Sequence, residues 1–393
     1  MEEVIKIALL CLFTLLILLA LGGNILVCAA VYMDRKLRTQ PENLFLVSLA
    51  FSDLLVSLLV MIFAAANDLL GYWPFGQAYC QFWICFDITC CTASILNLAA
   101  ISLDRYLLIS RPMCYARYSS KRVIIIAIFV IWLISALIGS AQIIFGAASR
   151  DFLLENEEDN GFSKKENPTC HLDLQPLYAI VSSSLSFFLP ASIMVLLYTR
   201  LYMYARKHVR QLRAQLKMTT TYLIMQMATQ QLRQPIFIRY SSLQNIAQVT
   251  HVALNGEEVK YNSILDPKPD NNFNTEICRE LMPAERMKSN PVKSSISDQK
   301  ARVTLGIIMG TFLICWLPFF VVNIWRSLNP HFFSQHVFQL VTWLGYANST
   351  ANPIIYGIFN RDFRRAFSRI VVKMFYCFDK KRQGFYSYNK TSL

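Results

Sequence analysis

One carboxylate, Asp87, lies in the middle of an apolar run, Cys80–Ile109, that is long enough to cross a membrane. An ionised side chain at the centre of a bilayer costs at least ~2.5–3.5 kcal/mol on insertion scales, so such residues usually face an interior cavity and act there. No Lys or Arg stands near Asp87 within this run. We therefore expect a cationic partner from elsewhere, and a ligand is the simplest one.

Hydroxyl and aromatic side chains on later apolar runs complete a site that suits a small aromatic amine. Ser182 and Ser186 share a helix face at i, i+4 spacing, and Thr342 and Tyr346 repeat this spacing. An anion, an aromatic cage and hydroxyls together offer ion pairing and cation–π contact. Taken singly, a membrane serine usually bonds to backbone and an aromatic usually packs. The candidate ligand-binding residues are Asp87, Cys91, Ser182, Ser183, Ser186, Trp316, Phe319, Phe320, Asn323, Thr342 and Tyr346.

A second intramembrane carboxylate, Asp53, falls among amides and hydroxyls on other runs. Oxygen ligands of this kind suit Na⁺, and a shared proton or a static, water-filled hydrogen-bond network are the other interpretations. Ion binding is slightly favoured. The candidate sodium residues are Asp53, Ser94, Asn348, Ser349 and Asn352, with Asn24 nearby.

Two further motifs lie near helix ends. In Asp104-Arg105-Tyr106, the arginine is within reach of Asp298, just before the sixth run, and the pair would latch the helices together; simple solvation of the charges is the alternative. In Asn352-Pro353-Ile354-Ile355-Tyr356, the spacing places Asn348, Asn352 and Tyr356 on one stripe.

The elements that must position these residues are membrane helices. The 393 residues are 54% hydrophobic and only 16% charged, against about 25% charge in soluble proteins. The composition predicts an all-α membrane protein with seven helices. The first run is too long for a cleaved signal peptide and is interpreted as a retained anchor. The apolar runs are 4–32, 43–70, 79–109, 123–147, 177–204, 303–324 and 337–359.

Charge at the helix ends predicts orientation. Basic residues lie between the first and second runs, between the third and fourth, and after the last, whereas 149–173 is acidic. By the positive-inside rule, the C-terminus is cytoplasmic and the N-terminus extracellular. Because the positive charges stand only at helix ends, the net charge of +13 does not indicate nucleic-acid binding.

The 11 cysteines are mostly within the apolar runs, where they behave as small apolar residues. Cys80 and Cys170 both fall on the extracellular, oxidising side, and we expect a disulfide between them. The remaining cysteines and the scattered histidines lack the spacing of metal ligands, so no metal site is predicted.

The expected layout has residues 1–207 holding five helices, with an extracellular loop at about 148–175. Residues 208–299 form a long, largely disordered cytoplasmic loop, within which 218–240 is either an extension of helix five or a membrane-skimming helix, and the extension is preferred. Residues 300–359 hold the last two helices. In 360–393, an amphipathic helix at 360–372 lies on the inner leaflet, and Cys377 is either palmitoylated or unmodified.

Together these residues resemble the rhodopsin-type family of G-protein-coupled receptors over all but the long loop and the tail. The resemblance is carried by Asn24, Asp53, Cys80, Asp104-Arg105-Tyr106, Trp132, Pro190, Cys315-Trp316-Leu317-Pro318 and the Asn352–Tyr356 motif. Asp87 with Trp343-Leu344-Gly345-Tyr346 narrows it to receptors for biogenic amines. One departure stands in helix two, where Ile62 replaces the proline common after Val60-Met61.

The resemblance implies a plasma-membrane receptor that is not an enzyme and needs no cofactor beyond an allosteric Na⁺. Its partners would be a small cationic amine, a heterotrimeric G protein, arrestin, a receptor kinase and the bilayer. It also implies a switch between pocket and helix six, and an arginine that engages the G protein. The implied coupling and switch residues are Asp104, Arg105, Tyr106, Asp298, Ile95, Pro190, Phe312, Tyr198, Asn352, Pro353 and Tyr356.

Different parts of the sequence resemble receptors for different amines. The stretches 86–97, 102–109 and 316–323 are most similar to serotonin type-6 receptors, which implies a stimulatory G protein and a rise in cyclic AMP. The set Ser182, Ser183 and Ser186 is typical instead of dopamine and other catecholamine receptors. Serotonin is placed first, dopamine second, and octopamine or tyramine third. A membrane transporter is a remote alternative, motivated by Asp53 and Asp87.

Overall fold

The computed structural model describes residues 2–110, 115, 120–157, 170, 175–231, 291–330 and 332–374, with the backbone alone over 144–157 and 291–305. The chain divides into two compact units, Met1–Leu201 with Ser295–Leu393, and Tyr202–Ser294. Of the second unit, the structure describes residues 202–231, which belong to one helix, and the backbone of 291–294, which begins another. Cys377 lies outside the described residues, so its modification stays a prediction.

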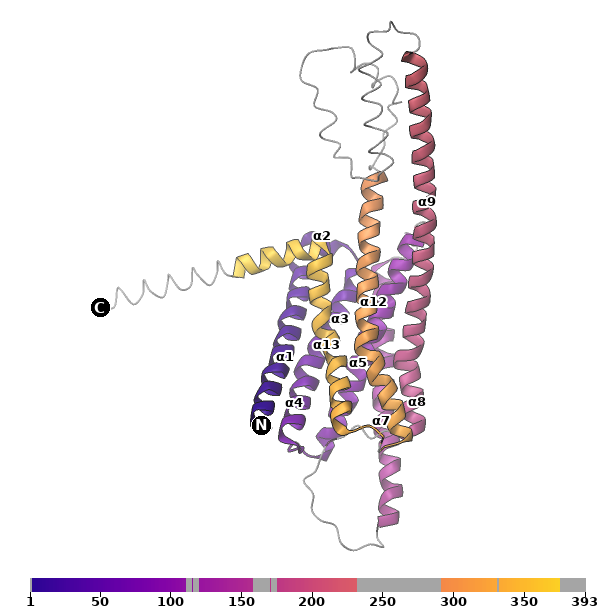
Figure 1. Cartoon of the computed structure of the whole chain (residues 1–393). Helices are drawn as coiled ribbons and strands as arrows, with labels where there is room; N and C mark the ends of the chain where they lie inside the picture. Colours follow the sequence, from indigo (N-terminus) through magenta and orange to yellow (C-terminus); the bar gives the residue numbers. More distant parts are fainter. Residues whose placement is uncertain are drawn as a thin grey trace, which may run out of the picture. The chain divides into compact units, whose positions relative to one another are not determined.

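The described residues form helices and no strand (Figure 1), as the predicted all-α fold requires. An additional helix covers 361–374, where the amphipathic helix was predicted. In chain order the elements are α1 (Glu2–Met33), α2 (Arg35–Thr39), α3 (Asn43–Leu55), the π-helical segment η1 (Val56–Met61), α4 (Ile62–Leu70), α5 (Gln77–Ser110), α7 (Lys121–Glu157), α8 (Pro176–Ser183), the π-helical segment η2 (Ser184–Phe188), α9 (Leu189–Gln231), α12 (Pro291–Leu328) and α13 (Gln335–Phe359).

Six stretches of these helices are long and apolar enough to cross a membrane, from Glu3–Met33 through Gly306–Leu328. The seventh helix, α13, is 25 residues long but less apolar, because it carries polar side chains at 348–350 and 352. All four of these side chains are buried inside the bundle. The polar stripe is therefore turned away from lipid, as a membrane helix with an interior function requires.

Helix α5 is the centre of the bundle, since it packs against both α3 and α7, while α1 packs against α3 and α13. The closest approaches occur at glycines. A Cβ on Gly139 of α7 would overlap the Thr89 side chain of α5, and one on Gly23 of α1 would lie 2.8 Å from Pro353 of α13. Glycine at these two positions lets the helix backbones approach closely.

Two helices contain a π-helical segment at pocket depth. In helix two, η1 occupies the stretch where Ile62 follows in place of a proline, and the indole N–H of Trp83 donates to the carbonyl of Val60 at 3.2 Å. In helix five, η2 immediately precedes Leu189 and Pro190. Such segments change the face that later side chains present, so both outer helix ends depart from a simple 3.6-residue repeat.

Two predicted boundaries are moved by the structure. Helix α9 continues past 207 to Gln231, so the part of 218–240 that is described extends helix five, as the preferred interpretation held. At the other end of the bundle, α7 continues to Glu157, ten residues into the stretch that was predicted as loop from about 148. Helical hydrogen bonding does not stop where hydropathy falls, because polar residues also form helices.

Candidate ligand-binding site

A cavity opens between the third, fifth, sixth and seventh helices. All eleven residues predicted to bind a ligand line it, together with two that the sequence analysis passed over, Ile88 and Thr92. Ile88 lies three residues before Cys91 and four before Thr92, so helical spacing from Cys91 would have found Ile88, and spacing from Ile88 would have found Thr92.

Asp87 presents its carboxylate to this cavity and receives two neutral donors. The hydroxyl of Tyr346 donates to Oδ2 at 2.8 Å, and the thiol of Cys91 donates to Oδ1 at 3.1 Å. Among the described residues, no Lys, Arg or His forms an ion pair with Asp87. Neutral donors orient a carboxylate without cancelling its charge, so a cation in the cavity would meet it directly.

Hydroxyl groups gather on the helix-five side of the cavity. Ser182, Ser183 and Ser186 are all buried, with 8%, 1% and 3% of their surface exposed. Ser186 pairs with the hydroxyl of Thr92 at 3.1 Å, and the amide of Asn323 donates to Ser183 at 3.4 Å. The spacing rule placed only Ser182 and Ser186 on one face, whereas η2 follows directly after Ser183 and all three are buried on the same side.

An aromatic wall on α12 closes the third side. The rings of Trp316 and Phe319 meet edge to face with centroids 5.8 Å apart, and Phe319 and Phe320 do so at 5.2 Å. Phe187 of η2 stacks on Phe320 at 4.5 Å. Such a wall can pack against an aromatic ligand, and the electron-rich faces of its rings attract an ammonium group.

Tyr346 is held by a chain of contacts that the sequence analysis did not predict. Its ring meets Trp343 edge to face at 5.7 Å, and the Trp343 indole N–H donates to Asp68 Oδ2 at 2.8 Å. Gln339 donates to the other oxygen of Asp68 at 3.0 Å, while Phe13 of α1 stacks on Trp343 at 3.8 Å. The signal that was missed is an acidic residue, Asp68, within an apolar run.

A second cavity shares Asp87 and Tyr346 with the first and reaches Asp68 and Cys170. The predicted disulfide between Cys80 and Cys170 is confirmed, with the two Cα atoms 5.8 Å apart. It ties Cys170 to the beginning of α5, so the disulfide lies at this second cavity.

Asp53 lies fully buried below the cavity, and three predicted neighbours donate to it. Ser94 and Ser349 donate to Oδ1 at 3.0 and 2.9 Å, and Asn352 donates to Oδ2 at 2.9 Å. The Nδ2 of Asn348 is buried without a hydrogen bond among the described residues. Carboxylate, hydroxyl and amide oxygens are ligands for a hard cation, so the donor set fits Na⁺.

Arg105, at the other end of α5, is held by two carboxylates. It lies 3.5 Å from Asp104 and 3.9 Å from Glu42, and the Tyr115 hydroxyl donates to Asp104 at 2.9 Å. Glu42 was not predicted, because it lies in the turn just before α3 and shares no motif with Arg105. The side chain of Asp298 lies outside the described residues, so the predicted latch stays a prediction.

The predicted switch residues occupy the core between these two ends. Ile95 and Phe312 are fully buried, and Phe312 lies 5.6 Å from the ring of Phe187. Near the Arg105 end, Tyr356 is buried and packs its ring 5.6 Å from Phe363 of the 361–374 helix. The Tyr198 hydroxyl packs against Gly306, where a Cβ would overlap it, while Pro190, Asn352 and Pro353 are buried.

Comparison with known proteins agrees with this geometry. The profile of the family described as "7 transmembrane receptor (rhodopsin family)" matches residues 23–356. Dopamine receptor 1 of Drosophila melanogaster is 43% identical over 358 residues, covering 91% of this chain and 61% of the fly protein. The D(1B) dopamine receptor of Mus musculus is 35% identical, covering 93% and 70%, and the D(1A) dopamine receptor of Didelphis virginiana is 36% identical, covering 92% and 72%. The chain thus spans less than two thirds of the fly relative's length.

Proposed function

Because this chain belongs to the rhodopsin family of seven-transmembrane receptors, we propose that the ligand in its cavity is dopamine. It is a multi-pass membrane protein and a G-protein-coupled receptor for a biogenic amine, not an enzyme. The choice among amines rests on Asp87 facing three buried serines of helix five across one cavity. Asp87 would bind the ammonium group, and the serines would bind the two hydroxyls of a catechol ring.

This proposal replaces serotonin, which the short stretches 86–97, 102–109 and 316–323 had favoured. Those stretches surround residues common to amine receptors in general, so they discriminate poorly among amines. The likeness to the dopamine receptors named above extends over more than 90% of this chain. A catechol turns two adjacent hydroxyls toward the serine set, and each of them can both donate and accept, whereas a hydroxyindole offers one hydroxyl and a ring N–H that only donates.

The deciding experiment uses cells expressing the full chain, exposed to dopamine, serotonin, octopamine and tyramine, with cyclic AMP and calcium as parallel readouts. We expect dopamine to act at the lowest concentration and to raise cyclic AMP. At equal expression on the cell surface, Asp87→Asn should abolish the response, since the ion pair with the ammonium is lost. A response to serotonin at a lower concentration than to dopamine would contradict the choice of dopamine. An unchanged dose–response in Asp87→Asn would contradict the assignment of Asp87 to the amine site.

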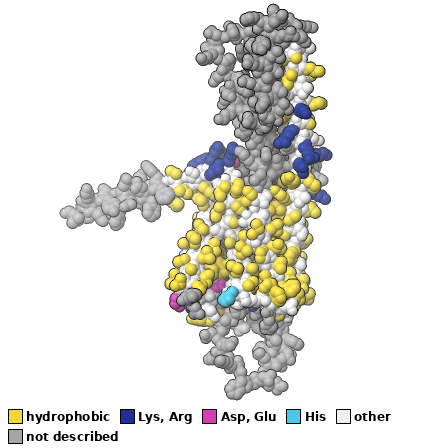
Figure 2. Space-filling view, in the orientation of Figure 1, with side chains coloured by type: hydrophobic (Ala, Val, Ile, Leu, Met, Phe, Trp, Pro, Cys, Tyr) yellow, Lys and Arg dark blue, Asp and Glu magenta, His cyan; other side chains and the backbone are white. Residues whose placement is uncertain are grey.

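Coupling is proposed at the basic end of the bundle, where Arg105 lies. Figure 2 shows Lys and Arg side chains gathered over α2 and the 361–374 helix at one end of the apolar surface. Basic residues mark the cytoplasmic side of membrane proteins. In the proposed orientation the Cys80–Cys170 disulfide would face the outside of the cell, and Arg105 would engage a stimulatory G protein, and later arrestin and a receptor kinase.

We further propose that Asp53 and its four predicted neighbours bind Na⁺ when the receptor is at rest. Raising Na⁺ against a matched concentration of an organic cation should then lower agonist affinity, and Asp53→Asn should remove this dependence. Equal effects of both cations on the parent receptor would contradict a specific sodium site. An Asp53→Asn receptor that keeps the sodium effect would place the ion elsewhere.

A further inference from the structure

A third cavity lies away from the ligand site, where the end of α1 meets the helix at 361–374. Its lining is half apolar and half charged. The lining residues are Met33, Asp34, Ala366, Arg369, Ile370 and Lys373. None of these residues takes part in the amine site, the sodium cluster or the contacts of Arg105.

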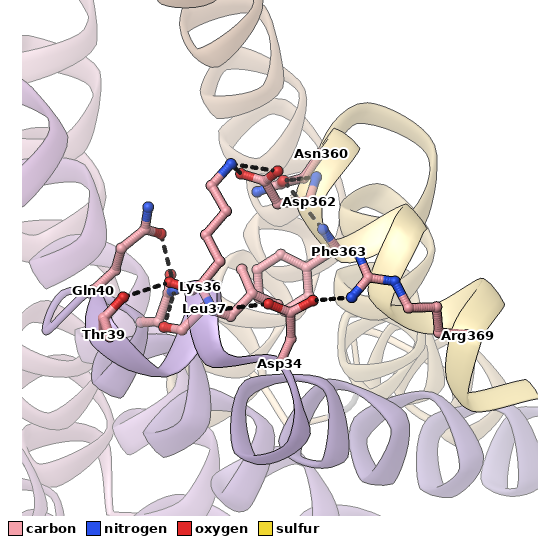
Figure 3. Close-up of polar contacts among 10 residues, drawn as sticks. Asp34, Lys36, Leu37, Thr39, Gln40, Asn360, Asp362, Phe363 and Arg369 are labelled. Atoms are coloured by element: carbon pink, nitrogen blue, oxygen red, sulfur yellow. Dashed lines mark hydrogen bonds and ion pairs between the residues drawn. The ribbon is translucent and has the colours of Figure 1, made fainter. Parts of the chain in front are cut away.

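Two ion pairs join the short helix α2 region to the 361–374 helix beside this cavity (Figure 3). Lys36 contacts both carboxylate oxygens of Asp362 at 2.8 Å. Asp34 accepts the backbone N–H of Lys36 at 2.9 Å through Oδ1 and Arg369 Nη1 at 3.0 Å through Oδ2. Asp34 and Asp362 are therefore each matched by one basic partner.

The rest of the charge here is positive. Residues 34–40 and 360–374 hold eight Lys and Arg against Asp34 and Asp362, so six positive charges stand in excess. The Arg369 side chain remains 69% exposed although it pairs with Asp34. Lys373 follows one helical turn later and is also exposed, so the two cations sit side by side on the mouth of the cavity.

The cavity lies at the level of the lipid headgroups. The membrane-spanning stretch of α1 ends at Met33, which is one of its lining residues. On the 361–374 helix, Phe363 and Ala366 are buried against the bundle, whereas Val372 and Met374 are 64% and 59% exposed. A helix with exposed apolar and basic side chains at the end of a membrane span lies in the interface plane.

From these observations we infer that the cavity binds an anionic phospholipid of the inner leaflet. The headgroup phosphate contacts Arg369 and Lys373, and an acyl chain lies along Met33 and Ile370. Basic pockets beside membrane helices on the cytoplasmic side are suited to anionic headgroups. Asp34 competes with the phosphate for Arg369, so it limits the affinity of the site.

The test measures binding of fluorescent phosphatidylserine to the purified full-length receptor in neutral detergent, with fluorescent phosphatidylcholine as the uncharged comparison. We expect saturable binding of phosphatidylserine alone. The double variant Arg369→Gln/Lys373→Gln should weaken it about 25-fold, since each basic residue near a membrane contributes roughly a factor of five. Glycerophosphoserine, the headgroup without acyl chains, should compete poorly, because the apolar lining would be left uncovered.

Two further variants separate this site from general charge attraction. Arg361→Gln/Arg365→Gln removes the same charge from the same helix outside the cavity, and it should change binding less than twofold. Asp34→Asn keeps an N-cap side chain for α2 but removes the competing carboxylate, so phosphatidylserine should bind several-fold more tightly. Equal losses in the two double variants, or weaker binding in Asp34→Asn, would overturn the inference, as would full competition by glycerophosphoserine.

Discussion

At the scale of single residues, the site depends on where neutral donors stand relative to one charge. Tyr346 and Cys91 orient the carboxylate of Asp87 but leave its charge for a ligand. The serines on the far side hold pairs with neighbours, Thr92 with Ser186 and Asn323 with Ser183. Recognition of the ammonium is thus concentrated in one residue, whereas recognition of the ring hydroxyls is shared among several.

The serines provide a prediction with an internal control. Ser182→Ala and Ser186→Ala should each weaken dopamine about tenfold, the size of one lost hydrogen bond, and should weaken serotonin much less. Ser184→Ala is the matched control, because Ser184 lies in the same helix but does not line the cavity and donates to the carbonyl of Ile180. The measurement is competition binding with both amines. Similar small losses for both amines would mean that the serines serve packing alone.

Asp68 is predicted to act on the ligand through Trp343 and Tyr346. Asp68→Ala removes the acceptor of the Trp343 indole, so the Tyr346 hydroxyl loses its support and amine affinity should fall about fivefold to tenfold. In a Tyr346→Phe background, Asp68→Ala should cause little further loss, because the hydroxyl that it positions is gone. Independent effects of the two substitutions in this double-mutant cycle would contradict the relay.

At the scale of elements, irregular turns and close glycine contacts decide which faces meet. In η1, the carbonyl of Val60 accepts a hydrogen bond from the indole of Trp83. The three buried serines of helix five lie in η2 or in the turn just before it. Between helices, the contact of α1 with α13 is set at Gly23, which lies against Pro353. Pro353 follows Asn352 directly, so the close packing of Pro353 on Gly23 helps to position the hydrogen bond from Asn352 to Asp53.

Gly23→Ala should therefore destabilise the receptor, whereas Gly22→Ala should not. The new Cβ at 23 would lie 2.8 Å from two atoms of Pro353, and overpacking of this kind costs typically about 1–3 kcal/mol. At 22 a Cβ meets nothing within 4 Å, so the better helix propensity of alanine makes the change neutral or slightly stabilising. Thermal unfolding of the detergent-solubilised receptor measures both. Equal midpoints of thermal unfolding for the two variants would contradict this prediction, because Pro353 would then shift without loss of stability.

At the scale of the whole molecule, the ligand cavity and the Arg105 end are joined through one buried core. Ile95, Phe312 and Trp316 belong to the same apolar cluster as residues near Arg105. Asp53 and Asn352 lie between these ends and join α3 to α13. A ligand that moves the aromatic wall on α12 therefore acts on a continuous packed network, which has discrete arrangements and does not deform smoothly.

Glu42 is predicted to help hold the resting arrangement by its contact with Arg105. Glu42→Gln should raise cyclic AMP in the absence of agonist by up to about fivefold, as expected for a partly exposed ion pair worth roughly 0.2–1 kcal/mol. Glu42→Asp keeps the carboxylate and should stay closer to the parent. Basal signalling that is unchanged in Glu42→Gln, at equal surface expression, would mean that Asp104 holds Arg105 alone.

Much of this protein follows from the sequence by itself. Hydropathy determined the membrane helices, helical periodicity paired Ser182 with Ser186 and Thr342 with Tyr346, and the positions of Cys80 and Cys170 predicted the disulfide. These properties follow from local sequence, because a membrane helix must satisfy its own backbone and its faces repeat every 3.6 residues. Only the tertiary structure brought Glu42 to Arg105 and Asp68 to Trp343, and turned all three serines inward. Such contacts depend on how helices rotate, bulge and approach one another, and no spacing within a single helix encodes that.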